Sequence, residues 1–158
     1  MPRKLWLGAG IVLALFVVDR VTRQVAFTNS PRTLVPGFLA SAPTTNTGVT
    51  FGLSVPGPLL LAMVAVLLLV VAVIARSAYH AGHAWRWTAA LAIGAGAISN
   101  LFDRLEYGYV RDFLKLSFWP TTANLGDWLI TFGAIVLILT SMPRRHTRIE
   151  PSTSTEAK

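Results

Sequence analysis

The chain has 158 residues, of which 53% are hydrophobic and 13% are charged, whereas soluble domains carry roughly 25% charged residues. This composition, with a mean hydropathy of +0.56, excludes an ordinary soluble domain and indicates a membrane protein made of one domain. The chain lacks cysteine, its three histidines lack metal-ligand spacing, and its net charge of +7 forms no basic stripe interleaved with aromatics, so we expect no cofactor, metal or nucleic acid.

Four apolar segments predict an all-α membrane protein with four transmembrane helices. They cover residues 5–18, continuing through Asp19 to Phe27, and then 58–75, 87–102 and 129–142. Only the second reaches the roughly 18 uncharged residues of a spanning helix by itself, and the others include polar residues at one end. A signal peptide is the competing interpretation of the first segment. No clear small-residue cleavage site precedes Asp19, however, so we expect a retained first span.

The connecting segments predict little further structure. Residues 28–57 are rich in Pro, Gly, Thr and Ser with scattered apolar residues, which indicates a small ordered extracytoplasmic turn-and-strand element. Residues 105–122 mix aromatic and charged residues, as is typical of a segment lying in the headgroup layer. We therefore expect one four-helix domain over residues 1–143 and a disordered, basic cytoplasmic tail over residues 144–158.

Basic residues favour one orientation of the four spans. With a cytoplasmic N-terminus, eight Lys and Arg residues lie inside and six lie outside. The helix-flanking clusters MPRK and PRRHTR support this N-in, C-in arrangement by the positive-inside rule, and the positive charge also attracts anionic lipid. The polar ends of the first, third and fourth spans then all face outward.

Two of these polar ends repeat one pattern. Asn100 precedes Asp103, and Asn124 precedes Asp127, so that an amide and a carboxylate at positions i and i+3 share a helix face in each case. The pattern also has an ordinary structural interpretation, because Asn124 or Asp127 can cap the fourth helix.

The first span ends in Asp19 and Arg23, which are spaced at i and i+4 for an ion pair and can simply lie at the membrane interface. Ionisable groups near membrane depth are costly, however, and several gathered at one leaflet indicate a functional site. Two carboxylates in a dry, shared site titrate as a unit and leave one acid and one base, as in aspartic proteases. The pattern leaves open which two act together among Asp19, Asp103, Asp112 and Asp127.

Five blocks in chain order resemble the signal peptidase II family, the lipoprotein signal peptidases of bacterial inner membranes. They are Asp19 with Arg23, NTGVTF at 46–51, AGAISNLFDR at 95–104, GYVRDF at 108–113 and ANLGD at 123–127. No single block is decisive, but the five in order, with the right spans between them, are highly specific. The family implies an aspartic endopeptidase with four transmembrane helices.

The resemblance implies that Asp112 and Asp127 are the catalytic pair. The substrate would be a diacylglyceryl-modified prolipoprotein, cleaved just before its lipobox cysteine on the periplasmic side of the inner membrane. We expect a monomer whose partners are this substrate and membrane lipid. The alternatives are an inactive paralogue that binds lipoprotein precursors and a small non-enzymatic carrier, although the chain lacks the repeats typical of carriers.

The resemblance also implies roles for the other polar residues of these blocks. The substrate-binding residues would be Asn46, Gly48, Asn100, Arg104 and Asn124, because buried amide and guanidinium groups can satisfy peptide carbonyls in the membrane. We expect Asn124 to orient the Asp127 carboxylate as well. The structural polar residues would be Asp19, Arg23 and Asp103, with Arg104 or Asn100 as the partner of Asp103.

The blocks depart from the family pattern at several positions that bear on efficiency or substrate preference. Arg23 stands where Lys is usual, Ala95 and Ser99 replace glycines, Ala123 replaces an aromatic residue and Gly126 replaces Ala. Arg111 places a cation beside Asp112. Because consecutive residues of an extended segment point to opposite sides, we expect Arg111 to turn away from the catalytic pair, into the headgroup layer.

Overall fold

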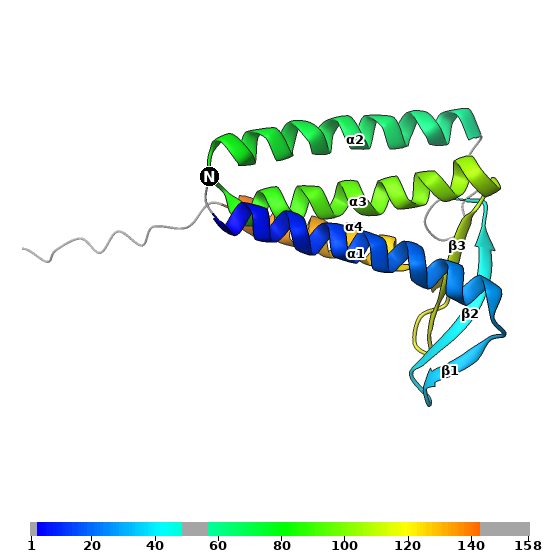
Figure 1. Cartoon of the computed structure of the whole chain (residues 1–158). Helices are drawn as coiled ribbons and strands as arrows, with labels where there is room; N and C mark the ends of the chain where they lie inside the picture. Colours follow the sequence, from blue (N-terminus) through cyan, green and yellow to red (C-terminus); the bar gives the residue numbers. More distant parts are fainter. Residues whose placement is uncertain (1–2, 49–56, 143–158) are drawn as a thin grey trace, which may run out of the picture.

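The computed structural model describes residues 3–48 and 57–142. Its elements, in order, are α1 (Arg3–Thr28), β1 (Arg32–Val35), β2 (Leu39–Asn46), α2 (Gly57–His80), α3 (Ala84–Tyr107), β3 (Val110–Leu116), β4 (Thr122–Ala123) and α4 (Leu125–Ser141). The four helices run alongside one another, and the strands lie together at one end of them (Figure 1). Phe51 of the second sequence block and the predicted tail at 144–158 lie outside the described residues.

Helix α3 is the centre of the bundle, because it contacts α1, α2 and α4. Small residues allow the close approach of α3 and α4. A methyl group on Gly133 would lie 2.8 Å from the carbonyl oxygen of Ala89, and one on Gly96 would overlap the carbonyl oxygen of Gly126. The two helices therefore pack backbone to backbone, which fixes the polar start of α4 against the polar end of α3.

Two of the described helices, α1 and α2, are long and apolar enough to cross a membrane, with hydropathies of 1.8 and 3.1 over their most apolar windows. Much of their apolar surface points away from the protein: Val66 and Leu69 of α2, for example, are 61% and 67% exposed. A mostly helical chain with this much exposed apolar surface fits a lipid environment. The number of spans and their orientation stay predictions.

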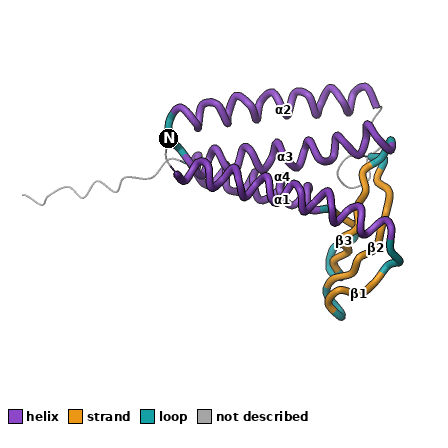
Figure 2. Tube along the Cα trace, in the orientation of Figure 1, coloured by secondary structure: helices purple, strands orange, loops and turns teal. Residues whose placement is uncertain are grey.

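The strands form one antiparallel sheet in the order β1-β2-β3-β4 (Figure 2). Strands β1 and β2 confirm the ordered element predicted between the first two helices. The interpretation of residues 105–122 as a headgroup-layer segment missed β3 and β4, so that the sheet is built from both connecting segments. The strand pattern was hidden because β3 does not alternate between buried and exposed residues: its first four residues, Val110 to Phe113, are all buried.

The register of this sheet brings the sequence blocks together. Thr44 of β2 pairs with Asp112 of β3, and Asn46 pairs with Val110. On the other side of β3, Leu114 pairs with Ala123, the residue before Asn124. Asp112 therefore lies between Asn46 of one connecting segment and Asn124 of the other.

Candidate active site

Asp112 is a buried carboxylate held by two side-chain amides. It is 1% exposed. Its Oδ1 accepts a hydrogen bond of 2.6 Å from Nδ2 of Asn124, and its Oδ2 accepts one of 3.0 Å from Nδ2 of Asn46. Each carboxylate oxygen thus has one neutral donor, and the carboxylate forms no ion pair within the described residues.

Asp127 lies in the first turn of α4 and is partly buried. Asn124 caps this helix: its Oδ1 accepts from the backbone N–H of Asp127 at 2.9 Å, and its own N–H donates to Oδ2 of Asp127 at 3.3 Å. The ordinary capping interpretation is therefore realised. The cap uses only one carboxylate oxygen, and Oδ1 of Asp127 accepts a further bond of 2.8 Å from Nδ2 of Asn100.

The structure extends the expected roles of Asn100, on α3, and of Asn124, the N-cap of α4. Asn124 contacts the Asp127 carboxylate as expected, through its backbone N–H, and its side-chain amide donates to Asp112 as well. Asn100 is the residue whose side-chain amide donates to Asp127. Each carboxylate is thus held by an asparagine that comes from a different element.

The environment of Asp112 favours its protonated form. Burial raises the pKa of Asp112 from 3.8 to about 6, and the negative charge of Asp127 acts in the same direction. The hydrogen bonds from Asn124 and Asn46 oppose this rise without cancelling it. Asp112 therefore holds a proton more readily than an ordinary aspartate, as one member of an acid–base pair must.

Arg104 connects the end of strand β2 to helix α3 by hydrogen bonds. Its Nη2 donates to the carbonyl oxygen of Gly48 at 3.0 Å, and the N–H of Gly48 donates to Oδ1 of Asn46 at 3.1 Å. Its Nη1 donates to the carbonyl oxygen of Asn100 at 3.3 Å. Its Nε is buried and has no hydrogen-bond partner among residues 3–48 and 57–142.

A cluster of buried ion pairs lies next to the two aspartates. Asp19 and Arg23 form the i, i+4 ion pair expected from their spacing, at 2.9 Å. Asp103 does not pair with the side chain of Arg104 or Asn100, as was expected, but with three other arginines. Arg23, Arg20 and Arg111 approach its carboxylate to 2.8, 2.6 and 3.0 Å. The fully buried charge of Asp103 requires these partners, because an unpaired buried carboxylate is strongly destabilising.

Arg111 turns away from Asp112, as the alternation of a strand predicts, but it does not reach the headgroup layer. It is only 5% exposed. Besides Asp103, its guanidinium contacts Oε1 of Gln24 at 3.0 Å and lies 4.3 Å from the centre of the Tyr107 ring. The expected exposure was wrong because a buried carboxylate and an aromatic face together offset the cost of burying the guanidinium.

Sequence reasoning missed two members of this cluster. Arg20 was counted only as an outside charge, although it lies one turn before Gln24 on the same helix face. Ser99, noted only as a replacement for glycine, donates from its hydroxyl to Oδ2 of Asp19. One feature of the sequence could have revealed Arg20. The spacing of Asp19, Arg20, Arg23 and Gln24 places four polar side chains on adjoining faces of one apolar helix.

The described residues contain no group of three or more His, Cys, Asp or Glu side chains that could hold a metal ion. The acidic side chains of the cluster are instead bound to arginine, serine and asparagine donors. Asp112 and Asp127, each held by neutral amide donors, can act as an acid and a base in proton transfer.

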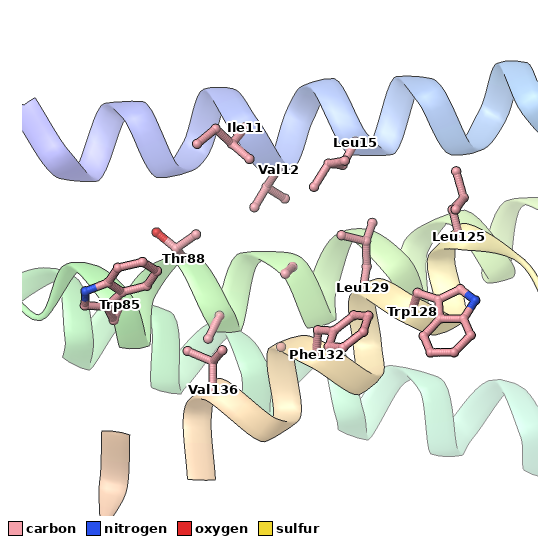
Figure 3. A pocket seen from close by; sticks show the side chains of 13 residues that line it. Ile11, Val12, Leu15, Trp85, Thr88, Leu125, Trp128, Leu129, Phe132 and Val136 are labelled. Atoms are coloured by element: carbon pink, nitrogen blue, oxygen red, sulfur yellow. The ribbon is translucent and has the colours of Figure 1, made fainter. Parts of the chain in front are cut away.

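An apolar cavity of about 310 Å³ lies between α1, α3 and α4 (Figure 3). Thr88 is its one polar lining residue, and Trp85 and Trp128 contribute indoles. Leu125 and Trp128 line its wall and flank Asp127 in the sequence, but neither Asp112 nor Asp127 lines it. Its lining residues Ile11, Trp85 and Phe132 are exposed, so it opens on the apolar outer surface of the bundle, and none of its lining residues is an acid or a base.

Residues 11–143 match the model of a family described as signal peptidase (SPase) II. The chain belongs to the signal peptidase II family. It is 33% identical over 141 residues to the lipoprotein signal peptidase of Syntrophomonas wolfei, an alignment that covers 82% of this chain and 89% of the relative. It is 37% identical over 137 residues to that of Moorella thermoacetica, covering 80% and 88%. These matches confirm the resemblance predicted from the five sequence blocks.

A solved structure, described as a bacterial membrane enzyme, superposes on this member of the signal peptidase II family with a TM-score of 0.76. The two chains are 23% identical, and the match covers 86% of this chain and 87% of the other. The fold is therefore shared with a membrane enzyme. Family membership makes the chain a peptidase, and Asp112 and Asp127, with the asparagines that hold them, form the candidate site of that activity.

Proposed function

We propose that this chain is a membrane-embedded aspartic endopeptidase that removes the signal peptide of diacylglyceryl-modified prolipoproteins, just before the lipobox cysteine. Asp112 and Asp127 are its catalytic pair. The observation that carries the proposal is that Asn124 binds both residues: its side-chain amide donates to Asp112, and its backbone N–H donates to Asp127. The two carboxylates thus belong to one hydrogen-bonded unit, and the charge of Asp127 raises the pKa of Asp112, which supports a coupled acid–base pair.

The reaction uses one protonated and one ionised carboxylate. The raised pKa of Asp112 suits it to hold the proton at the start of the cycle, which leaves Asp127 as the base. Asp127 takes a proton from water while the water oxygen attacks the scissile carbonyl carbon, and Asp112 gives its proton to the carbonyl oxygen. The C–N bond then breaks as the proton held by Asp127 passes to the leaving amine, and the carbonyl oxygen returns its proton to Asp112.

The surrounding polar residues hold the carboxylates and the substrate. Because Asn46, Asn100 and Asn124 already donate to the two carboxylates, we assign them mainly to positioning. Direct binding of the substrate backbone then falls to Arg104 and to the chain around Gly48, which Arg104 fixes. The buried Nε of Arg104, without a partner in the described part of the chain, supports this assignment because a buried donor favours an acceptor.

We further propose that all four helices cross the bacterial inner membrane, with both termini in the cytoplasm and the site on the periplasmic side. The candidate site lies at the end of the bundle that carries the sheet, opposite the start of α1 (Figure 1). Phe38, Phe118 and Trp119, in the connections between strands, are 50%, 66% and 44% exposed. Exposed aromatic rings of this kind suit the interface between membrane and water. Residues 1–143 then form one monomeric protease domain followed by a cytoplasmic tail.

The test is cleavage of a lipid-modified precursor by the purified chain in detergent micelles. The expected result is one cut before the modified cysteine and no cut in the same precursor without the diacylglyceryl group. Expression in a bacterial strain depleted of its own signal peptidase II should clear the accumulated precursor. Failure in both assays would instead favour an inactive paralogue that only binds lipoprotein precursors.

A further inference from the structure

Arg23 occupies the centre of the polar cluster and is 0% exposed. Its Nε donates to Asp19 at 2.9 Å, and its Nη1 donates to Asp103 at 2.8 Å. Its Nη2 donates to Oδ1 of Asn100 and to Oδ1 of Asn124, at 2.7 Å in both cases. One nitrogen of a single guanidinium thus binds the two asparagines that hold the candidate catalytic carboxylates.

This contact, together with the backbone N–H of Asp127 that donates to the same oxygen of Asn124, decides which way both asparagine amides face. A guanidinium has only donors, so each asparagine must present its oxygen to Arg23 and turn its NH₂ group away. The NH₂ group of Asn100 then donates to Asp127 at 2.8 Å, and that of Asn124 donates to Asp112 at 2.6 Å. The carboxylate oxygens accept these bonds, because an ionised carboxylate offers only acceptors and a protonated one keeps acceptor capacity.

We propose that Arg23 is a positioning residue for both catalytic carboxylates, acting through Asn100 and Asn124, and not only a structural ion-pair partner of Asp19. The proposal rests on the proposed function, because it assumes that Asp112 and Asp127 carry the chemistry. It changes the role expected for Arg23 from its sequence position alone, which was structural.

The guanidinium is itself held in one orientation. Asp19 and Asp103 bind Nε and Nη1, and the planar group then directs Nη2 toward the asparagines. Asp19 is fixed in turn, since its Oδ1 accepts from the N–H of Gly126 at 2.9 Å. The ion pairs therefore set the direction of the donor, and the donor sets the direction of both amides.

Gly126 leaves the space that Nη2 needs. A Cβ at position 126 would lie 2.8 Å from Nη2 of Arg23 and 2.9 Å from Oδ1 of Asn124, both closer than real Cβ contacts. The nitrogen cannot withdraw freely, because ion pairs hold its guanidinium. A methyl group there would therefore displace the contact between Arg23 and Asn124, although it would keep the backbone N–H that binds Asp19.

Lysine, although usual at this position in the family, cannot make the same set of contacts in this chain. It keeps the charge, but its ammonium is one nitrogen with three donors, whereas Arg23 makes contacts to Asp19, Asp103 and both asparagines through three nitrogens. Arg23→Lys should therefore keep the charge balance of the ion-pair cluster and release at least one asparagine amide. Charge and positioning can thus be separated by a single conservative substitution.

The first test compares Arg23→Lys with Arg20→Lys in the cleavage assay. Arg20 also pairs with Asp103, at 2.6 Å, but its hydrogen bonds to Asp103 and to the carbonyl oxygen of Ser99 involve neither asparagine, so it is the matched control. In Arg23→Lys we expect kcat to fall about 10- to 100-fold with little change in KM, because misplaced catalytic groups lower the rate of the chemical step. In Arg20→Lys we expect kcat to stay within about twofold of the wild-type value, which is a difference no larger than the variation of the assay.

A pH–rate profile distinguishes the positioning role from a purely structural one, because a purely structural role of Arg23 would leave the pH dependence of cleavage unchanged. Loss of the Asn124 hydrogen bond would raise the pKa of Asp112 further, because that bond lowers it. The limb assigned to Asp112 should therefore move to higher pH in Arg23→Lys and stay in place in Arg20→Lys. An unchanged profile with an unchanged kcat in Arg23→Lys would overturn the proposal.

The second test is a double-mutant cycle with Gly126→Ala, which retains every charge and so remains informative if Arg23→Lys does not fold. Gly126→Ala alone should lower kcat while the melting temperature stays within a few degrees of wild type. Added to Arg23→Lys, the same methyl should cost much less, because no guanidinium nitrogen is then displaced. A normal kcat in Gly126→Ala, or fully additive losses, would count against the positioning role.

Asp112→Asn, measured beside these variants, distinguishes a failure of the catalytic assignment from a failure of the positioning role of Arg23 alone. If it still cleaves, the assignment of Asp112 and Asp127 as the catalytic pair fails, and the positioning role of Arg23 fails with it. If it is inactive while Arg23→Lys and Gly126→Ala cleave like wild type, the catalytic pair stands and only the positioning role of Arg23 fails.

Discussion

The side-chain amide of Asn124 donates a 2.6 Å hydrogen bond to Asp112, twelve residues earlier in the chain. The same residue caps helix α4 and so fixes Asp127 one turn into that helix. A sheet residue and a helix residue are thereby held in one geometry by a single asparagine. Strand β3 and helix α4 can therefore place their two carboxylates at the same peptide bond of a substrate.

Asp112→Asn and Asp127→Asn should each abolish precursor cleavage while the protein still folds. Each change removes one half of an acid–base pair and keeps the volume of the side chain, and loss of general acid–base catalysis costs about 10²- to 10⁴-fold. Single-turnover cleavage of a lipidated precursor measures the loss. Glu106→Gln is the control, because this carboxylate is exposed and 3.9 Å from Arg20. Cleavage by either aspartate variant at the wild-type rate would move the catalytic assignment to another carboxylate.

Asn124→Ser should separate helix capping from catalysis. Serine is as good a cap as asparagine, so Asn124→Ser should keep the roughly 1 kcal/mol of the cap that Asn124→Ala loses, while both variants lose the contacts of Asn124 with Arg23 and Asp112 alike. Serine lacks the amide that reaches Asp112, however, so both variants should lose most of their activity. Melting temperatures in detergent and initial cleavage rates give the two readouts. An active Asn124→Ser variant would show that the amide bond to Asp112 is dispensable.

The asparagines also show how far the sequence could predict the site. The spacing of Asn100 with Asp103 and of Asn124 with Asp127 correctly indicated shared helix faces, because a helix fixes the i, i+3 geometry. It could not indicate that Asn100 would bind Asp127, since that contact depends on the packing of α3 against α4. Local periodicity predicts which side chains share a face, and tertiary packing decides which of them touch.

The same limit explains the errors in the fold. Residues 58–75 were predicted as a helix from composition alone, and α2 covers them. Strand β3 was missed because Arg111 and Asp112 are both buried, on opposite faces, each by its own polar partners. Alternation of apolar and polar residues identifies a strand only when one face meets water or lipid, and here neither face of this stretch does.

The pH dependence of stability should report on Asp112. Its folded pKa of about 6 lies above the 3.8 of the unfolded chain, so between these values the folded state binds more protons. The contribution of Asp112 to the free energy of unfolding of the wild type is therefore complete below pH 4. It falls by about 3 kcal/mol in total as the pH rises through 6. Asp112→Asn has no such proton, so its stability relative to wild type should rise over this window. Chemical denaturation in micelles at pH 4, 5, 6 and 7 measures the difference, and a constant difference would contradict the raised pKa.

Labelling of single cysteines should establish the orientation. The chain has no native cysteine, so Gly82→Cys and Thr47→Cys each provide one site. Gly82 lies in the turn between α2 and α3, and exposed Thr47 follows β2 at the sheet. With the N-terminus in the cytoplasm, a membrane-impermeant thiol reagent added to intact spheroplasts should label position 47 and not position 82. Labelling of position 82 from outside would reverse the proposed orientation.

Arg111→Val should damage stability far more than the pH dependence of catalysis. The guanidinium binds the buried carboxylate of Asp103 at 3.0 Å through Nη2, and it points away from Asp112. Removing one partner of a buried ion pair costs about 3–5 kcal/mol, although Arg20 and Arg23 remain to neutralise Asp103 and should bring the loss toward the lower end of that range. Arg32→Val removes an exposed charge from the same sheet and is the control, with a change near zero.

The catalytic readout for Arg111→Val is a pH–rate profile on the lipidated precursor. Because Arg111 has its hydrogen bonds with Asp103 and Gln24, the position of the profile should shift by less than about 0.5 unit. A shift of about one unit or more, equivalent to about 1.4 kcal/mol, would mean that Arg111 acts directly on the proton shared by the carboxylates. A large loss of melting temperature with an unshifted profile would instead place Arg111 with the ion pairs that hold α1, α3 and β3 together, since its contacts lie on those three elements.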